Sequence, residues 1–204
     1  MAQYKKDQIK EIIDSAALEV FSQKGYLNTK ITDISKNSGV SVGNIYRYYK
    51  GKEDIFYSVI PSDFFDLLKN KLTGKIAVWK DNHDSSSQSL ISKELVSFII
   101  DNRKLFLIIF GRCDGTIYEN AKKEIIDILT DAFIANYLSK LNINLEENID
   151  TIKLIYEKHF ETISSAFILA DSEDNLRKML QLINCYHVNG ITSFISSNFE
   201  MEEN

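Results

Sequence analysis

The hydrophobic positions of the chain repeat with the period of an α-helix over most of its length. The clearest stripe lies near the N-terminus, where apolar side chains follow one another at steps of three and four residues. Its members are Ile9, Ile12, Ile13, Ala16, Ala17, Val20 and Phe21. No apolar–polar alternation extends beyond four residues, so the pattern predicts an all-α protein. Gly25 is expected to end this first helix.

Two short helices are expected after Gly25. The first covers about residues 31–37, with Thr29 or Lys30 at its N-cap. The second covers about residues 42–48 and has Ser41 as its N-cap, a position that favours serine because the hydroxyl accepts from a free backbone N–H.

A longer helix is expected to open near Lys52, with acidic residues in its first turn, where they suit the helix dipole. Pro61 falls inside this pattern and predicts a kink or a restart, because an interior proline removes a backbone donor. Residues 80–89 are the clearest loop. About nine helices are expected in all, and the later ones cover 90–101, 103–111, 118–141, 147–170 and 173–198.

The composition is that of a globular protein. Of 204 residues, 44% are hydrophobic and 26% charged, which excludes wholesale disorder. The longest apolar run, residues 105–110, is far shorter than the ~20 residues that cross a bilayer, and the first ten residues are too polar for a signal peptide. The separated Cys113 and Cys185 favour buried thiols over a disulfide framework. We therefore expect a cytoplasmic protein with no membrane partner.

Charge is distributed unevenly. The net charge is −5, but residues 1–60 carry nine Lys or Arg against seven Asp or Glu, whereas residues 61–204 carry fifteen against twenty-two. Residues 34–52 contain four bases and no acid; the bases are Lys36, Arg47, Lys50 and Lys52. Because charges are screened over about 8 Å at physiological salt, this local patch matters more to a polyanion than the whole-chain sum.

Residues 29–52 have the features of a helix-turn-helix. Two short helices that cross need a small residue, here Ser35, and a turn that tolerates a left-handed residue, here Gly39. The apolar anchors are Ile31, Ile34, Val40 and Ile45. The outer face of the second helix then shows side chains that can contact phosphates and base edges, namely Val42, Asn44, Tyr46, Arg47 and Tyr48.

A specific order of residues follows the first stripe: Phe21, Lys24-Gly25-Tyr26, Thr29, Asp33-Ile34, Gly39-Val40-Ser41, Gly43, Tyr46, Tyr48 and Lys52-Glu53-Asp54. Through these positions, residues 9–59 resemble the DNA-binding domain of the TetR family of bacterial transcriptional regulators. The departures are Lys30 for a common threonine, Ser35 and Ser38 for alanines, Tyr49 for phenylalanine, and Pro61. The Tyr49 hydroxyl lies near the domain core and needs a partner or a route to water.

The resemblance implies a DNA-contacting set. Thr29 would cap the second helix beside the DNA backbone, and Gly43 would allow close approach. Phosphates would be held by Ser41, Tyr46, Tyr48 and Lys52, and bases or further phosphates by Asn44 and Arg47, next to Val42. The alternatives are that the two tyrosines pack the domain and that Arg47 is a solvated charge.

The rest of the chain is expected to bind an effector. It holds fifteen of the twenty-three aromatic residues. An apolar or aromatic small molecule would be lined by Trp79, Phe98, Phe106, Phe110, Phe133, Tyr137, Tyr156 and Phe160. The alternatives are core packing for each of these side chains, and a cationic ligand that suits the acidic excess.

The last two helices are expected to form a dimer interface, as the resemblance implies. Their stripe residues are Ile163, Phe167, Ile183, His187, Gly190, Ile191 and Phe194. Dimerisation also suits the motif, because two copies about 34–36 Å apart read a palindrome.

These features predict a helix-turn-helix domain at 1–50 and a helical regulatory, ligand-binding and dimerisation domain at 51–204. The expected function is that of a ligand-released repressor that binds palindromic operator DNA as a homodimer. An activator, or an all-α module that binds protein partners without an inducer, is the alternative. The sequence shows no catalytic constellation and no metal-ligand spacing among its three histidines, so we expect neither an enzyme nor a metal or cofactor.

Overall fold

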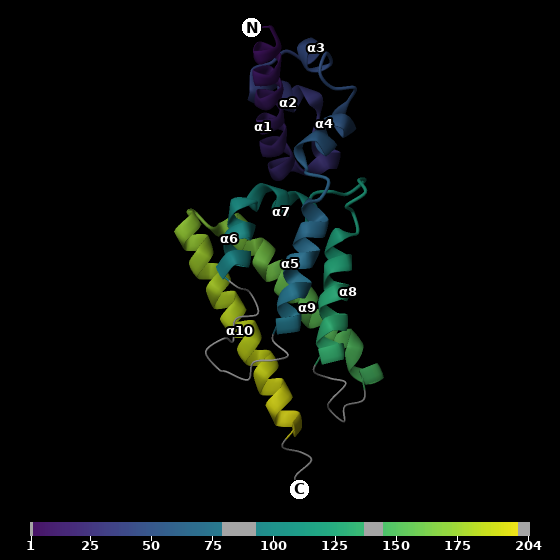
Figure 1. Ribbon diagram of the computed structural model, residues 1–204, viewed down its shortest axis with the longest axis vertical. Coiled ribbons are helices and arrows are strands. Elements are labelled where there is room, and N and C mark those ends of the chain that lie inside the picture. The colour runs from purple at the N-terminus through teal and green to yellow at the C-terminus, as the bar shows by residue number, and fades with distance from the viewer. Residues whose placement is uncertain (1, 79–92, 137–144, 200–204) are drawn as a thin grey trace. The chain divides into compact units, whose positions relative to one another are not determined.

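The computed structural model describes residues 2–78, 93–136 and 145–199 of the chain (Figure 1). Within these ranges the chain forms ten helices and no strand, which confirms the prediction of an all-α protein. The helices are α1 (Ala2–Asn28), α2 (Ile31–Ser38), α3 (Val42–Ile45), α4 (Lys52–Val59), α5 (Phe64–Val78), α6 (Lys93–Asp101), α7 (Arg103–Ile109), α8 (Ala121–Asn136), α9 (Leu145–Leu169) and α10 (Glu173–Phe199). The loop expected at 80–89 lies outside the described residues.

The helices belong to two compact units. The first comprises Met1–Phe65 with Asn102–Lys122, and the second comprises Asp66–Asp101 with Lys123–Asn204. The first unit therefore contains α1 to α4 together with α7. The domain boundary expected after residue 50 stays a prediction.

The core of the first unit is built on the apolar stripe of α1. Ile13, Ala17 and Phe21 are fully buried, and so are Ile34 of α2 and Ile45 of α3. Ile12, which was also expected on the stripe, is 48% exposed because it lies at the edge of the buried face. Burial of this one face is what holds helices as short as α2 and α3 in place, since neither is long enough to be stable alone.

Gly25 interrupts α1 rather than ending it. Its φ of 78° and ψ of 167° break the helix, and a last turn then continues to Asn28. The break brings the Tyr26 backbone N–H to the carbonyl of Arg112, at 2.8 Å. A second link between these segments is the ion pair of Lys104 on α7 with Glu19 on α1, at 2.6 Å. The end of α1 is thus joined to α7 and the chain after it.

The helix stops before Pro61 and a new helix starts after it, which is the restart rather than the kink of the two outcomes expected there. Helix α4 ends at Val59, and α5 begins at Phe64, whose N–H donates to the Pro61 carbonyl at 3.0 Å. Between the two helices, the Ile60 side chain is 2% exposed, so the break itself is anchored in the core of the first unit.

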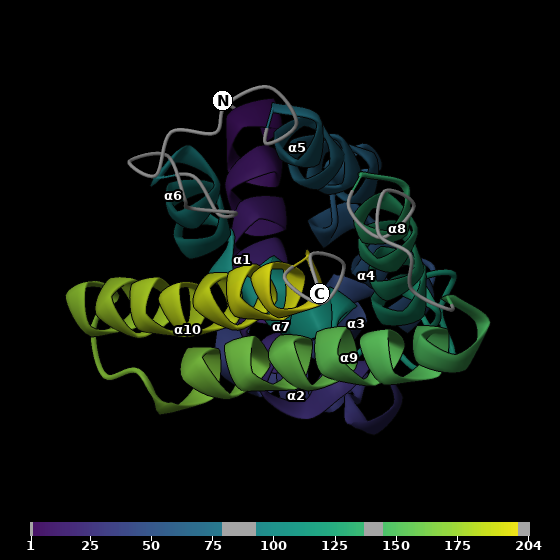
Figure 2. The ribbon, with the colours of Figure 1, turned by 90° about the horizontal axis from the view of Figure 1, so that it is seen from below.

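The second unit contains most of α5 together with α6, α8, α9 and α10. Helices α9 and α10 lie side by side and run in opposite directions (Figure 2). The Ser172 hydroxyl caps α10 by accepting from the Asn175 N–H at 3.2 Å. Arg177 on α10 reaches the Ser97 hydroxyl on α6 at 3.4 Å.

No helix in the described ranges is both long and apolar enough to cross a lipid bilayer.

Cys113 is buried, and burial raises the pKa of its thiol to about 11. Cys185 is exposed, contrary to the expectation that both thiols are buried, because it lies on the outer face of α10 beside Tyr186.

Substitution of Gly25 by alanine is expected to destabilise the first unit. The residue has a positive φ, and an added Cβ would lie 3.2 Å from the Arg112 carbonyl oxygen. The expected loss is about 1–3 kcal/mol in the free energy of unfolding, measured by urea denaturation. Gly51→Ala is the control, because Gly51 has an extended backbone and a Cβ added there would meet no atom within 4 Å. Equal losses in both variants would contradict this explanation.

Candidate functional site

The turn before α3 is fixed by local hydrogen bonds. Gly39 ends α2 in the left-handed conformation, with φ 70°. The Ser35 hydroxyl donates to the Val40 carbonyl at 2.7 Å, and the Ser38 hydroxyl accepts from the Val40 N–H at 3.1 Å. Both serines stand where the TetR resemblance expects alanine, so these departures add polar contacts to the turn. The Ser41 hydroxyl then accepts from the Asn44 N–H at 3.4 Å and acts as the predicted N-cap of α3.

Helix α3 itself is short. It ends at Ile45 rather than at the expected residue 48, and Tyr46, Arg47 and Tyr48 form a turn after it. The turn is closed by the Arg47 N–H, which donates to the Asn44 carbonyl at 3.1 Å, and by the Tyr48 N–H, which donates to the Ile45 carbonyl at 2.9 Å. Three residues that were expected on a helix therefore lie in a tight, hydrogen-bonded turn.

The predicted DNA-contacting residues of this segment differ in exposure. Ile45 is completely buried and holds α3 in the core, while Tyr46 is 54% exposed. Arg47 and Gly43 are also exposed. Val42, Asn44 and Tyr48 are half-buried, and Ser41 is exposed. A buried anchor thus carries a row of accessible polar, aromatic and basic groups.

Thr29 and Lys52 are turned toward the protein. Thr29 is 2% exposed, its hydroxyl donates to the Gly25 carbonyl at 2.7 Å, and the N-cap position of α2 is taken by Lys30. The Lys52 ammonium donates to the Tyr26 carbonyl at 2.7 Å and lies 4.3 Å from the centre of the Tyr26 ring. Burial lowers the pKa of Lys52. Both side chains hold the end of α1 in this structure.

The hydroxyl of Tyr49 finds its partner in Asp14 of α1. Tyr49 is buried and donates to the Asp14 carboxylate, which also accepts from the Ser58 hydroxyl of α4 at 3.2 Å. Lys10 pairs with the same carboxylate at 3.1 Å. Burial, with the hydrogen bond to Asp14, raises the pKa of Tyr49. This cluster ties Tyr49, directly after the turn of residues 46–48, to α1 and α4, and no sequence pattern indicated that Asp14 would be its centre.

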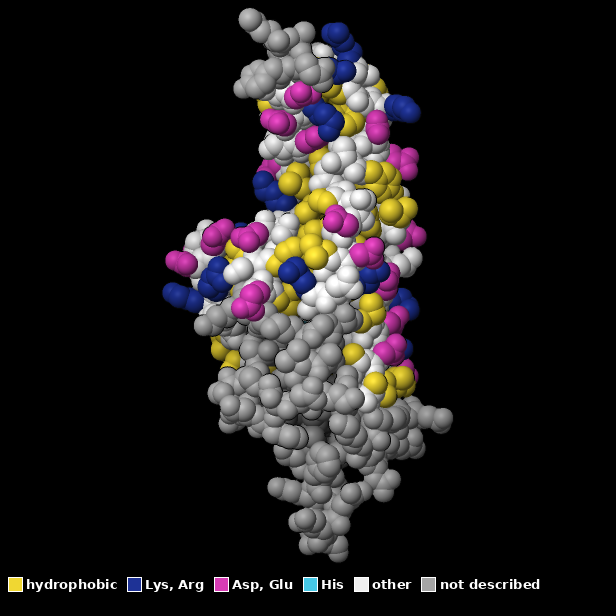
Figure 3. Space-filling view, in the orientation of Figure 1, with side chains coloured by type: hydrophobic (Ala, Val, Ile, Leu, Met, Phe, Trp, Pro, Cys, Tyr) yellow, Lys and Arg dark blue, Asp and Glu magenta, His cyan; other side chains and the backbone are white. Residues whose placement is uncertain are grey.

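Asp33, an acidic residue within the helix-turn-helix, is paired with neighbouring groups of the protein. Asp33 pairs with Lys24 at 2.9 Å and accepts from the Lys30 N–H at 2.9 Å, and the Lys24 ammonium holds the pKa of its carboxyl below the usual range. Lys and Arg side chains lie on the visible face of the first unit near the end where Figure 1 draws α3 (Figure 3). The four bases of residues 34–52 are therefore not offset by a free carboxylate on Asp33.

The residues predicted to bind an effector are divided between the two units. Phe106 and Phe110 are buried in the first unit, where their rings lie 5.4 Å apart. In the second unit, Tyr156 and Phe160 are buried, and Phe98 lies under the Lys71 ammonium. Trp79 and Tyr137, and the side chain of Phe133, lie outside the described residues.

The residues predicted for the dimer interface lie at different depths on α9 and α10. Phe167 and His187 are buried, Ile163 and Ile183 are half-buried, and Gly190 is exposed. The side chains of Ile191 and Phe194 lie outside the described residues. Other large apolar side chains are exposed on the same two helices. The single apolar stripe predicted for each helix did not include them; they are Leu154, Ile155, Ile168, Leu169, Leu182 and Tyr186.

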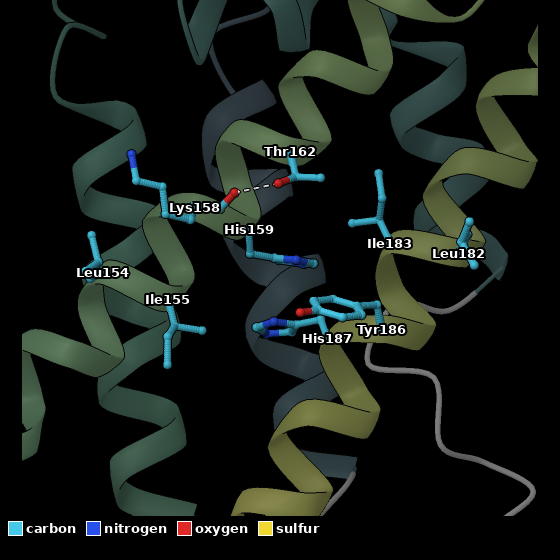
Figure 4. A pocket seen from close by; sticks show the side chains of 9 residues that line it. All are labelled: Leu154, Ile155, Lys158, His159, Thr162, Leu182, Ile183, Tyr186 and His187. Atoms are coloured by element: carbon cyan, nitrogen blue, oxygen red, sulfur yellow. Dashed lines mark hydrogen bonds between the residues drawn. The ribbon is translucent and has the colours of Figure 1, made fainter.

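A groove of about 720 Å³ runs between α9 and α10 (Figure 4). It is lined by Leu154, Ile155, Lys158, His159, Thr162, Leu182, Ile183, Tyr186 and His187. The imidazoles of His159 and His187 stack with their centres 3.8 Å apart, and Tyr156 packs edge-on against His187. In the described part of the chain, no group of three or more His, Cys, Asp or Glu side chains is arranged to hold a metal ion.

Lys52→Ala is expected to destabilise the protein by about 1–2 kcal/mol, because it leaves the Tyr26 carbonyl without its ammonium donor. Lys50→Ala is the matched control, since Lys50 is exposed and carries the same charge two residues earlier. Urea denaturation at neutral pH gives both values. A Lys52→Ala variant as stable as Lys50→Ala would show that these hydrogen bonds contribute little.

The histidine pair is expected to make stability depend on pH. Burial lowers the pKa of His187 to about 4 and that of His159 to about 3, with the charge of His187 adding to the effect on His159. In the unfolded chain an imidazole has a pKa of about 6.5, so below that pH the unfolded chain binds more protons than the folded chain. The histidine pair therefore leaves the free energy of unfolding unchanged above about pH 6.5 and lowers it as the pH falls toward 4. The expected loss at pH 5 is about 2 kcal/mol for each imidazole.

Urea denaturation at pH 7 and pH 5 measures this effect. The His187→Phe variant separates it from the titration of carboxylates, because it keeps an aromatic ring next to Tyr156 and removes one titrating group. Its stability should change less between the two pH values than that of the natural chain. The same change in both proteins would contradict the assignment.

Comparison with known proteins agrees with this geometry. Residues 13–59 match the family model described as bacterial regulatory proteins, tetR family. The fatty acid metabolism regulator protein of Bacillus subtilis (strain 168) is 44% identical over 55 residues, which are 27% of this chain and 28% of that protein. An HTH-type transcriptional regulator of Staphylococcus aureus (strain USA300) is 30% identical over 124 residues, or 59% of this chain and 65% of that one. The chain thus spans less than two thirds of either relative.

The fold is similar to that of a solved TetR-like transcriptional regulator from Rhodococcus sp. RHA1. The TM-score is 0.53 at 15% identity, over 90% of this chain and 96% of the other. The matched family and these relatives are regulators rather than enzymes. The matched residues contain the helix-turn-helix built from α2, Gly39 and α3, so residues 13–59 form a DNA-binding domain of the type found in the TetR family of bacterial regulatory proteins.

Proposed function

We propose that the protein is a DNA-binding transcriptional repressor that binds a palindromic operator as a homodimer and is released by a small-molecule effector. The observation that carries the proposal is the anchored segment of residues 41–48, which comprises α3, its cap and the turn after it and is called the recognition segment below. Ile45 is buried, while Tyr46 and Arg47 are exposed directly after it, in a stretch without acidic residues. This arrangement presents a guanidinium and a phenol to a polyanion from a fixed backbone.

The proposed contacts differ in kind. Gly43 and the Ser41 hydroxyl lie at the start of α3, where the backbone can approach a phosphate closely. Arg47 and Asn44 carry the donors suited to guanine and adenine edges in the major groove. Tyr46 and Tyr48 would hold phosphates through their hydroxyls. Thr29 and Lys52 would act by positioning α1 and α4, since both already make hydrogen bonds within the protein.

Dimerisation would use the outer face of α9 and α10. This face exposes the large apolar side chains of Leu154, Ile155, Leu182 and Tyr186, which a second copy would remove from water. A single recognition segment contacts few base pairs, so two copies are needed to read a long site.

The effector would bind in the second unit and favour an arrangement of the dimer with lower operator affinity. Such coupling requires that the effector bind one arrangement more tightly, typically by about 1–3 kcal/mol. Buried aromatic residues such as Tyr156 and Phe160 support an apolar effector. The name of the Bacillus subtilis relative makes a fatty acid the first compound to test.

Fluorescence anisotropy with the DNA upstream of the gene tests the proposal. We expect tight binding that weakens steeply with salt, and a loss of about tenfold or more in affinity for Arg47→Ala and for Tyr46→Ala, because each removes a contact to bases or phosphates. Arg47→Ala should also relax the discrimination against operator duplexes that are changed at the base pair Arg47 contacts. Added fatty acid should lower the anisotropy of the complex.

Lys178→Ala is the control, because Lys178 is exposed on α10 and carries one positive charge outside the recognition segment. Its operator affinity should equal that of the natural chain. If the protein binds the upstream DNA no more tightly than a shuffled duplex, the proposal that an operator lies there is wrong. If fatty acid binds the protein without releasing DNA, the proposal that it is the effector is wrong.

A further inference from the structure

The exposed turn of the recognition segment stands between two buried side chains. Ile45 before the turn is completely buried, and Tyr49 directly after it is 4% exposed. The Tyr49 N–H donates to the Ile45 carbonyl at 3.1 Å, so the two buried residues also close the turn between them. The exposed side chains of Tyr46 and Arg47 therefore take their direction from these two anchors.

The two anchors restrict the turn in different ways. The Ile45 side chain is aliphatic, and burial of apolar surface is non-directional, so Ile45 fixes the depth of the turn more than its orientation. Tyr49 adds a hydroxyl that donates to Oδ1 of Asp14 on α1. A hydrogen bond weakens steeply when donor and acceptor are misaligned. The Tyr49 hydroxyl is therefore the group suited to fix the direction that the turn faces.

The carboxylate that accepts this hydrogen bond is itself held in place. Lys10 pairs with the second oxygen of Asp14, Oδ2, at 3.1 Å, and its ammonium lies 5.6 Å from the centre of the Tyr49 ring. The Ser58 hydroxyl of α4 lies 3.2 Å from Oδ1. Asp14 also follows Ile13, which is fully buried, so its backbone belongs to the core face of α1. The turn is thus tied to a fixed point of the first unit.

We propose that Tyr49 and Asp14 are positioning residues for DNA binding, whose hydrogen bond sets the direction of the turn that carries Tyr46 and Arg47. Without this bond the turn would sample other directions. The apparent dissociation constant for DNA would then rise in inverse proportion to the fraction that faces correctly. The inference rests on the proposed function and assigns residues outside the expected DNA-contacting set, since the TetR resemblance expects phenylalanine, without a hydroxyl, at position 49.

Specific and non-specific binding should respond differently to the loss of this bond. Base edges are read by hydrogen bonds that require a defined direction of the side chain. Attraction of the basic groups to phosphates is largely independent of sequence and less dependent on direction. The hydrogen bond of Tyr49 should therefore matter more for an operator than for a duplex of shuffled sequence.

Fluorescence anisotropy of the full chain with the duplex upstream of the gene and with a shuffled duplex tests the proposal. Tyr49→Phe keeps the buried ring and the net charge and removes only the hydroxyl. We expect its dissociation constant to rise about three- to tenfold for the upstream duplex and less than about twofold for the shuffled one.

Ser58→Ala is the matched control. It removes the other hydroxyl next to the same oxygen of Asp14, but Ser58 lies on α4, outside the recognition segment. The Ser58 hydroxyl also donates to the Ile55 carbonyl at 2.8 Å, so the variant loses hydrogen bonds within the first unit as well. Its dissociation constant for the upstream duplex should change less than about twofold.

Two variants of the acceptor test the same bond from the other side. Asp14→Asn and Asp14→Leu change the charge equally and have similar size, but only the amide oxygen of asparagine can accept from the Tyr49 hydroxyl. Asp14→Leu should therefore bind the upstream duplex about three- to tenfold more weakly than Asp14→Asn. Adding Tyr49→Phe to Asp14→Leu should cause no further loss, because the bond is already absent.

A double-mutant cycle shows whether Tyr49 acts through the turn. In a chain that already carries Tyr46→Ala and Arg47→Ala, the effect of Tyr49→Phe on DNA affinity should fall below about twofold, since the contacts that it positions are missing. An effect that persists in full would show that Tyr49 acts in another way, and it would overturn the proposal.

Amide hydrogen exchange measures the order of the turn without DNA. The N–H groups of Arg47 and Tyr48 donate to carbonyls within the segment, at 3.1 and 2.9 Å. In Tyr49→Phe these two amides should exchange about three- to tenfold faster, because the turn opens more often. In Ser58→Ala their exchange rates should stay close to those of the natural chain.

The outcomes separate this inference from the proposed function. If the natural chain prefers the upstream duplex and Tyr49→Phe binds it equally well, the positioning role is wrong and the regulator stands. Equal losses in Tyr49→Phe and Ser58→Ala also overturn the role, because general destabilisation then explains both. If the natural chain selects no sequence from a pool of random duplexes, the proposed function fails and this inference fails with it.

Discussion

The burial of Ile45 is the contact on which the recognition segment depends. Helix α3 has only one turn, and an isolated helix of that length is not stable in water. Its position comes from the completely buried Ile45 side chain and from the Ser41 cap. Helix α3 packs against α2, whose Ile34 is also completely buried in the core of the first unit. Because the backbone is fixed in this way, the polar groups of Tyr46 and Arg47 point outward in a defined order.

The polar side chains of the first unit are of two kinds: some are hydrogen-bonded within the protein, and others are exposed to solvent. Asp14 joins α1 to Tyr49 and Ser58, and Lys52 joins α4 to the end of α1. These groups hold the helices together, and their hydrogen bonds are already satisfied by the protein. Tyr46 and Arg47, by contrast, are exposed. A small domain buries a smaller share of its surface than a large one. Hydrogen bonds between its helices therefore add stability that its small core does not supply.

The second unit uses apolar surface in two ways. Residues such as Leu176 and Leu180 fill its interior, while Leu182 and Tyr186 on the same helix remain in water. Exposed apolar side chains of this size are the kind of surface that a second protein chain can cover.

Local patterns in the sequence were enough to predict the helical class, the position of the recognition segment and the break at Pro61. Each of these follows from short-range chemistry: the spacing of apolar residues on α1, the Ser41 cap, the left-handed Gly39, and a proline without an N–H. The Tyr49 hydroxyl was also recognisable as a group in need of a partner. Such signals can be read from the sequence because they lie within a few residues of one another.

The partners that distant residues find depend instead on how the helices pack. Asp14 lies 35 positions before Tyr49, and Lys52 lies 26 positions after Tyr26, so no local pattern relates them. The same holds for Thr29, whose burial depends on the break at Gly25, and for Phe106 and Phe98, which belong to different units. Periodicity shows that a helix has an apolar side, but which of its apolar side chains are covered depends on neighbouring helices. For that reason the sequence could place His187 and Tyr186 on one helix, whereas the packing of α9 against α10 buried one ring and exposed the other.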